Sequence, residues 1–150
     1  MNRVWKPNVT VAALIERDGR FLLVEEETED GLRFNQPAGH LDEGESLVAA
    51  CAREALEETA WGFTPTALVG IYQWPRPQGD ITYLRFAFCG DLGAHEAGRA
   101  LDTGILRAVW KTPDEIRACA DRHRSPLVSQ CVSDYLAGRR YPLELIRHYD

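Results

Sequence analysis

The chain of 150 residues lacks an excess of positive charge. It carries 17 Lys and Arg residues against 23 Asp and Glu residues, so its formal net charge is −6 and its pI is near 5.2. This balance excludes a generally basic nucleic-acid-binding surface, and we expect no nucleic-acid partner. With 45% hydrophobic and 27% charged residues, the composition is that of an ordinary globular protein. The length predicts a single domain over residues 1–150.

Long apolar runs are also missing from the sequence. No stretch approaches the ~18 apolar residues that a membrane span requires, and the segment from Met1 to Thr10 has no apolar signal-peptide core. We therefore expect no membrane partner and a cytoplasmic location.

Cysteine is scarce, and no two cysteines have the C-x-x-C spacing of a zinc or redox motif. The four residues are Cys51, Cys89, Cys119 and Cys131. We expect free thiols rather than a disulfide framework. Because His95, His123 and His148 show no ligand spacing with the cysteines, no zinc site is expected.

The first half of the chain predicts strands followed by one main helix. Val9 to Ile15 and Phe21 to Val24 are β-prone runs joined through Asp18-Gly19, which predicts an opening hairpin. A helix is predicted from Ser46 to Thr59. The apolar face that we expect to pack on a sheet consists of Val48, Cys51, Ala52, Ala55 and Leu56.

The second half predicts further strands and two helices. Ile81 to Cys89 and Ile105 to Trp110 have strand character. Thr112 to Glu115 has the form of a capping box, and Ser125-Pro126 opens a helix that Gly138 can close. The order of elements predicts an α/β or α+β protein with helices covering a mixed sheet.

Acidic residues gather between Ala38 and Phe63 around one cation, Arg53. The six carboxylates belong to Asp42, Glu43, Glu45, Glu54, Glu57 and Glu58. On a helix the i, i+4 spacing places Arg53, Glu54, Glu57 and Glu58 within an arc of about 140°, opposite the apolar face. Since like charges at this spacing repel, the cluster requires a neutralising partner. Hard divalent cations such as Mg²⁺ meet this need with oxygen ligands and substrate phosphates.

An isolated pair of glutamates at this spacing is usually a solvated helix face. Here the spacing of six residue types is fixed at Gly39, Glu45, Arg53, Glu54, Glu57 and Glu58, which favours a metal–phosphate site. The pattern from Gly39 to Trp61 resembles the box of the Nudix hydrolases, G-x5-E-x7-R-E-U-x-E-E-x-G-U, where U is apolar. The resemblance implies an α/β/α sandwich and a hydrolase of diphosphate derivatives that depends on Mg²⁺, with Mn²⁺ as a substitute. Ala60 stands where the family has glycine, so the end of the helix is expected to differ.

The resemblance also implies roles for individual residues. Glu57 and Glu58 correspond to the main metal ligands, and the carbonyl of Ala38 to a third ligand. Glu54 corresponds to a ligand or to the group that orients the attacking water, and Glu45 and Arg53 to structural partners. The general base is left open between Glu54 and a loop acid, for which Asp102 is the candidate.

Segments outside the box extend the resemblance to one branch of phosphatases within the family. They are residues 9–12, 34–41, 84–86, 124–128 and 140–144. This branch implies a monomer that hydrolyses nucleoside tri- and diphosphates with release of orthophosphate, and also thiamine diphosphate and its hydroxymethylpyrimidine diphosphate precursor. Two alternatives stay open: a Nudix pyrophosphatase for a nucleotide sugar or dinucleoside polyphosphate, and a non-catalytic nucleotide-sensing module.

A few residues outside the cluster are candidates for substrate contacts. His40 follows the first glycine of the box and is as suited to a phosphate contact as to a turn. The aromatic candidates for ring stacking, each with packing in the sheet as the alternative, are Phe34, Tyr72, Trp74 and Tyr83. Arg85, Arg139 and Arg140 are possible phosphate ligands, although each is expected to be a surface cation.

Overall fold

A five-stranded mixed sheet forms the centre of the computed structural model, which describes residues 3–150. Its strand order is β5-β1-β7-β6-β9. β1 is parallel to β7, whereas the pairs β1–β5, β6–β7 and β6–β9 are antiparallel. The strands are β1 (Asn8–Leu14), β5 (Ala38–His40), β6 (Trp61–Pro75), β7 (Thr82–His95) and β9 (Tyr141–Pro142).

A second, four-stranded sheet is built around β3 (Arg20–Thr28). β3 pairs with β2 (Glu16–Arg17), β4 (Gly31–Asn35) and β8 (Ile105–Lys111), each time antiparallel. The predicted turn at Asp18-Gly19 is confirmed, with φ values of 52° and 77°. The predicted hairpin is confirmed next to this turn, where β2 pairs with β3 and the N–H of Leu22 donates to the carbonyl of Ile15. The rest of the first apolar run does not continue it, because β1 belongs to the other sheet.

β1 lies inside the first sheet because both of its faces are covered. Ala12 and Leu14 belong to one apolar cluster, and Val11 and Ala13 to another, as the two-residue period of a strand requires. All four residues have an exposed fraction of at most 1%. A strand that is apolar on both faces is typical of a sheet interior rather than of a solvent-facing hairpin.

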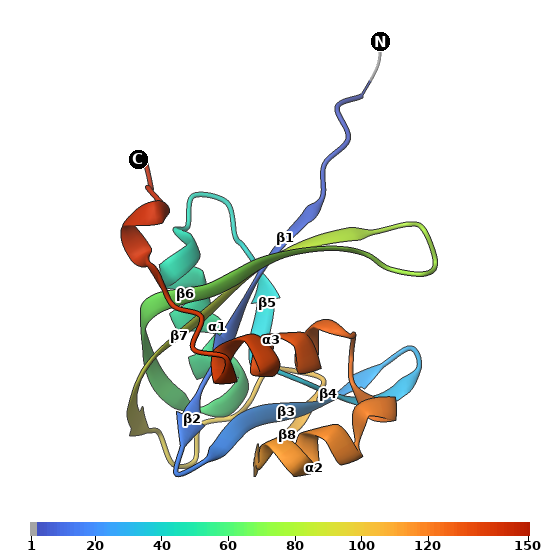
Figure 1. Cartoon of the computed structure of the whole chain (residues 1–150), viewed down its shortest axis with the longest axis vertical. Helices are drawn as coiled ribbons and strands as arrows, with labels where there is room; N and C mark the ends of the chain where they lie inside the picture. Colours follow the sequence, from blue (N-terminus) through green and yellow to red (C-terminus); the bar gives the residue numbers. More distant parts are fainter. Residues whose placement is uncertain (1–2) are drawn as a thin grey trace.

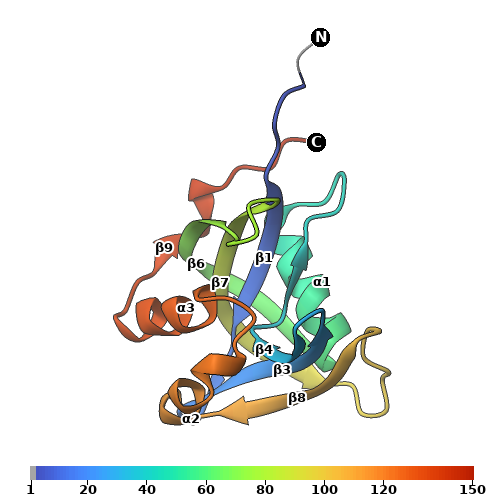
Figure 2. The same cartoon turned by 90° about the vertical axis from the view of Figure 1, so that its right-hand side faces the viewer.

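Helices flank the sheet, as Figures 1 and 2 show. α1 (Leu47–Thr59) packs against β1, β5 and β6, and α3 (Leu127–Leu136) packs against β6 and β1 from the other face. α2 (Pro113–Ala118) contacts β8 and α3, and two short 3₁₀ helices, η1 (Ala120–Arg122) and η2 (Leu143–Leu145), follow α2 and β9. The predicted sandwich with a mixed sheet is confirmed. Among the described residues, no helix is long and apolar enough to span a membrane.

The helix signals in the second half of the sequence are confirmed. Thr112 and Glu115 form both hydrogen bonds of a capping box at the start of α2. Pro126 is the N-cap of α3, and Gly138, with a φ of 83°, follows the helix and donates its N–H to the carbonyl of Tyr135.

The hairpin of β6 and β7 extends beyond the rest of the sheet (Figure 1). The predicted strand from Ile81 to Cys89 is only part of β7, and β6 was not predicted as an element. Three register shifts interrupt the pairing of β6 with β7, between Trp61 and Phe63, between Pro65 and Ala67, and between Leu68 and Gly70. Such bulges break the alternation of side chains by which a strand is recognised in a sequence.

Candidate active site

The carboxylate cluster is carried by α1, whose start is fixed by a side-chain cap. Ser46 has an extended backbone and its side chain accepts a hydrogen bond from the N–H of Ala49. The helix ends at Ala60, which has a φ of 64° and donates its N–H to the carbonyl of Leu56. The alanine thus adopts the left-handed conformation that the family's glycine would favour.

The acidic residues do not all lie opposite the buried face of α1, contrary to the sequence-based prediction. Glu54 and Glu58 are only 9% and 8% exposed. Of the predicted apolar face, Cys51 and Ala55 are buried, whereas the three remaining positions are half-buried. The reason is that β5 packs along the acidic side of the helix, where the N–H of Ala38 donates to Glu58 Oε1 at 2.9 Å.

Gly39 leaves the room that the Glu54 side chain occupies. A Cβ at this position would lie 2.2 Å from Cδ of Glu54, far inside van der Waals contact. The φ of Gly39 is not in the left-handed region. Close approach, rather than backbone conformation, therefore requires glycine at the start of the box.

Arg53 is the shared cation of the cluster. Its Nε and Nη2 donate to the two carboxylate oxygens of Glu45 at 2.7 and 2.9 Å, and its Nη1 donates to Glu54 and Glu57, each at 2.8 Å. Nη2 also donates to the carbonyl of His40 at 3.1 Å. The forked contact with Glu45 fixes the plane of the guanidinium and hence the position of the two glutamates.

Burial and charge shift the ionisation of these groups in opposite directions. The hydrogen bond from Arg53 holds the pKa of Glu45 below its usual value. Burial raises the pKa of Glu54, against the effect of Arg53. Burial also raises the pKa of Glu58 to about 8, although the hydrogen bond from Ala38 opposes this shift. The buried acids are thus poised to gain from a nearby cation.

A divalent cation fits the oxygen atoms that the structure brings together. Carboxylate oxygens of Glu54, Glu57 and Asp102 lie within 4.8 Å of one another, the one such group of His, Cys, Asp or Glu side chains in residues 3–150. The N–H of Asp102 donates to the carbonyl of Glu57 at 3.0 Å, which fastens the loop after β7 to α1. Hard oxygen donors of this kind suit Mg²⁺, Mn²⁺ or Ca²⁺.

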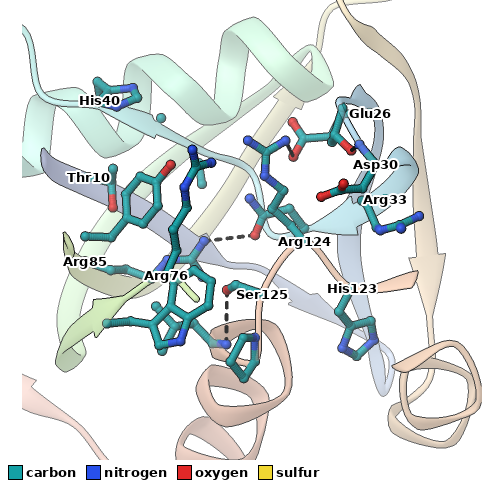
Figure 3. Close-up of a pocket in the computed structure, with 18 of the residues that line it drawn as sticks. Thr10, Glu26, Asp30, Arg33, His40, Arg76, Arg85, His123, Arg124 and Ser125 are labelled. Atoms are coloured by element: carbon teal, nitrogen blue, oxygen red, sulfur yellow. Dashed lines mark hydrogen bonds and ion pairs between the residues drawn. The ribbon is translucent and has the colours of Figure 1, made fainter. Parts of the chain in front are cut away.

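A pocket of about 1280 Å³ opens beside Glu54 and Glu58. Figure 3 shows Thr10, His40 and Arg85 on one side of this pocket, with Glu26 and Arg33 across from them. Further walls come from the tip of the β6–β7 hairpin and from residues 120–129. The pocket therefore joins the carboxylates to a region with several arginines.

The other sequence candidates separate into residues on the pocket and residues away from it. Trp74, Tyr83 and the exposed His40 line the pocket. Phe34 is instead buried beneath Lys111 and Arg122, and Tyr72 donates a hydrogen bond to Asp134. These two aromatic residues are structural.

The expectation that Arg85 is a surface cation is wrong, because its exposed fraction is only 5%. It lies on β7 and bonds to side chains that precede β5. Arg139 and Arg140 are exposed, as expected. Arg76 and Arg124 also line the pocket but could not be predicted from the sequence, because both lie in loops, which leave no periodic signal.

In the part of the chain that the structure describes, no cysteine or histidine belongs to a group of side chains that could hold a metal ion. All four cysteines are free. His123 contacts the carbonyl of Ile116 through Nε2 at 2.9 Å and the hydroxyl of Ser129 through Nδ1 at 3.2 Å. Both ring nitrogens of His123 therefore have hydrogen-bond partners within the fold.

The fold and the carboxylate cluster define a Nudix hydrolase. A family profile described as NUDIX domain matches residues 5–131, and the chain belongs to this family. Phosphatase NudJ of Escherichia coli (strain K12) is 39% identical over 147 residues, which cover 98% of this chain and 95% of that protein. The chain is therefore a phosphohydrolase that resembles NudJ, in a family that typically uses a divalent metal and acts on small-molecule diphosphates.

Solved structures agree with this assignment. A NUDIX hydrolase from Nitrosomonas europaea is 54% identical, with a TM-score of 0.93 and coverage of 96% of this chain and 98% of that chain. A MutT NUDIX hydrolase from Burkholderia pseudomallei is 17% identical, with a TM-score of 0.74 and coverage of 87% and 98%, and supports the fold alone.

Proposed function

We propose that this Nudix enzyme hydrolyses nucleoside tri- and diphosphates with release of orthophosphate, and also thiamine diphosphate and hydroxymethylpyrimidine diphosphate. Mg²⁺ is the proposed cofactor and Mn²⁺ its substitute. The observation that carries the proposal is the group of Glu54, Glu57 and Asp102 oxygens beside a pocket large enough for a nucleotide. The similarity to Phosphatase NudJ supports release of phosphate as the reaction.

Each carboxylate has a proposed role. Glu57 and Glu58 hold the metal, with the backbone carbonyl of Ala38 as a third ligand and Glu54 as a further ligand or the residue that orients water. Glu45 and Arg53 position these groups, as their forked contact suggests. When bound, a divalent cation supplies neutralisation of phosphate oxygens and acidification of water.

The proposed reaction breaks one phosphoanhydride bond. A water oxygen bonds to the terminal phosphorus while the bond from that phosphorus to the bridging oxygen breaks. The bridging oxygen leaves with the shortened phosphate ester, and the proton of the water passes to a carboxylate. Glu54 and Asp102 are both candidates for this base, and their closeness in the structure supports both.

The position of attack decides the products, so product analysis tests the proposal. The purified chain is incubated with Mg²⁺ and GTP, GDP, thiamine diphosphate or ADP-ribose, and orthophosphate is resolved from pyrophosphate by ion chromatography. We expect orthophosphate from the first three substrates. Pyrophosphate from GTP, or turnover of ADP-ribose alone, would replace the proposal with another Nudix specificity. A single catalytic domain, a monomeric state and a cytoplasmic location stay predictions.

A further inference from the structure

Strand pairing arranges pocket residues in rows at increasing distance from the carboxylates. Ala12 of β1 pairs with Ala38 of β5, and the N–H of Ala38 donates a hydrogen bond to Glu58. Two residues earlier, Thr10 pairs with Arg85 of β7, and Asn8 pairs with Tyr83. Alternate residues of a strand point to the same face. At ~3.3 Å per residue, the row of Tyr83 lies about 13 Å from the row of Ala38, with Arg85 between them.

An aromatic pair forms the far end of this series. Trp74 of β6 pairs with Tyr83 of β7, and their rings are stacked with centroids 6.1 Å apart and planes inclined by 14°. Both side chains are half-buried and line the pocket. A flat aromatic surface of this kind accepts any planar heteroaromatic ring, since every base has a π-face.

Arg85, in the middle row, is a buried cation held by neutral groups. Its Nη1 donates to Oε1 of Gln36 and its Nη2 to Oδ1 of Asn35, each at 2.9 Å. Within residues 3–150, no carboxylate lies within ion-pair distance of this guanidinium. Glu26, an acid that lines the pocket, is paired with Arg124 instead, with 3.6 Å between Oε1 of Glu26 and Nη1 of Arg124.

The surroundings of Arg85 fix its orientation without a direct ion pair, and the carboxylate of Glu26 acts on its charge only at longer range. The amide nitrogen of Gln36 donates to the carbonyl of Val128 at 2.8 Å, so the amide oxygen of Gln36 is directed at Arg85. Burying a charge is costly unless it is paired. A guanidinium has five N–H donors in a fork that suits phosphate. Because Arg85 lines the pocket, an anionic group of a ligand can supply the pairing.

We propose that the Trp74–Tyr83 pair stacks the heteroaromatic ring of the substrate and that Arg85 binds the phosphate nearest to that ring. This inference rests on the proposed function, because the terminal phosphate is then the one that reaches the carboxylates. It would account for the proposed attack of water at the terminal phosphorus and the proposed release of orthophosphate. It would also account for action on substrates with different rings, since stacking does not select the edge of the base.

Ligands that never reach the carboxylates test the inference separately from catalysis. GMP carries the ring and one phosphate, guanosine the ring alone, and ribose 5-phosphate the phosphate alone. Each is titrated calorimetrically into the full chain without divalent metal and again with Mg²⁺. We expect GMP to bind in both conditions. Absence of GMP binding, or binding only with metal, would overturn the inference.

Two variants divide the ring from the phosphate. Trp74→Ala should weaken the binding of GMP and guanosine about tenfold and leave ribose 5-phosphate unchanged. Arg85→Lys keeps the charge but loses the fork, so it should weaken GMP and ribose 5-phosphate and leave guanosine unchanged. Unaltered GMP affinity in both variants contradicts the proposed contacts. Trp74 is half-buried and lies one residue before the end of β6, so its variant remains informative if Arg85→Lys fails to fold.

Two controls complete the experiment. Gln73 is the neighbour of Trp74 on β6, is exposed and does not line the pocket, so Gln73→Ala should change no affinity. Glu57→Gln should reduce turnover while GMP affinity is retained. If the wild-type chain hydrolyses none of the substrates yet shows the expected pattern of GMP binding, the proposed function fails and the ring and phosphate contacts stand. If Glu57→Gln also abolishes GMP binding, the inference fails.

Discussion

Two ionic clusters of this molecule differ in the sign of the charge that is left over. The Arg53 cluster joins one arginine to four carboxylates, those of Asp42, Glu45, Glu54 and Glu57. The Glu25 cluster joins one carboxylate to two arginines, Arg107 and Arg122. Arg53 donates several charged hydrogen bonds and Glu25 accepts two, yet only the Arg53 cluster keeps an excess of negative charge.

The two clusters also differ in how completely their charges are paired, which distinguishes a site that can bind a cation from a contact that stabilises the fold. In the Glu25 cluster the buried acid is fully paired, and both arginines are exposed enough to be hydrated. In the Arg53 cluster one cation is shared among four acids, of which Glu45, Glu54 and Glu57 are themselves partly buried, so neutralisation is incomplete. The acids of the Arg53 cluster can therefore bind a further cation, whereas the paired charges of the Glu25 cluster stabilise the fold.

The largest expected effect comes from removing one carboxylate of the Arg53 cluster. Glu57→Gln keeps the size of the side chain but removes a charge from the proposed metal site. We expect kcat with Mg²⁺ and GTP to fall about a hundredfold or more, because the charge balance of the reacting phosphate depends on this site. Steady-state kinetics provide the measurement, with metal affinity determined by calorimetry. Wild-type turnover in this variant would remove Glu57 from the site.

A smaller effect is expected when the cluster is displaced but keeps its charges. In Gly39→Ala the new Cβ would lie 2.2 Å from Cδ of Glu54, so the carboxylate must move. We expect kcat to fall about tenfold, as for other changes that misplace a ligand. The melting temperature should change little, because the clash involves the end of a flexible side chain.

A second glycine provides the control for this variant. A Cβ at Gly62 would meet its nearest atom, a backbone oxygen, at 3.5 Å, which is ordinary contact. Gly62→Ala should therefore keep wild-type kcat. An equal kcat for Gly39→Ala and Gly62→Ala would show that turnover does not depend on the position of the Glu54 carboxylate.

The Glu25 cluster should respond in stability rather than in turnover. Glu25→Gln removes the charge but keeps the shape, and we expect a loss of about 1–2 kcal/mol at neutral pH with kcat within twofold of wild type. The hydrogen bonds from Arg107 and Arg122 hold the pKa of Glu25 below 4.5 in the folded protein. Its contribution is therefore present above this pH and is lost as the pH falls through the folded pKa.

Urea denaturation of both proteins between pH 7 and pH 3 measures this contribution. The difference in midpoint between wild type and Glu25→Gln should shrink toward acidic pH. A difference that stays constant over this range would mean that pairing of the charge is not its source.

The comparison also shows why one cluster could be predicted from the sequence and the other could not. The acids of the Arg53 cluster lie within one short segment, and the spacing of a single helix brings Arg53, Glu54 and Glu57 together. Glu25 meets Arg107 and Arg122 through the pairing of β3 with β8 and through a loop far along the chain. No local pattern records such contacts.

The same distinction applies to the pocket. Helix α1 was predicted within one residue of its bounds because its cap and period are local. The burial of Glu58 was not predicted, because it depends on β5, a strand of three residues. Arg85 was expected on the surface for the same reason: its partners Asn35 and Gln36 reach it only through the fold.

The smallest expected effect tests whether activity follows the charges of the Arg53 cluster or the stability of the helix that carries them. Ala60 ends α1 with a φ of 64°, a conformation that disfavours a side chain with a Cβ. Ala60→Gly should relieve this strain and stabilise the protein by at most about 0.5 kcal/mol, because the relief is offset by the extra entropy lost by glycine and by the loss of a methyl group that is only 3% exposed. The urea midpoint should therefore rise while kcat stays at its wild-type value, since no charge has moved. A rise in kcat together with stability would instead mean that fraying of α1 limits the reaction and that the excess negative charge alone does not define the active cluster.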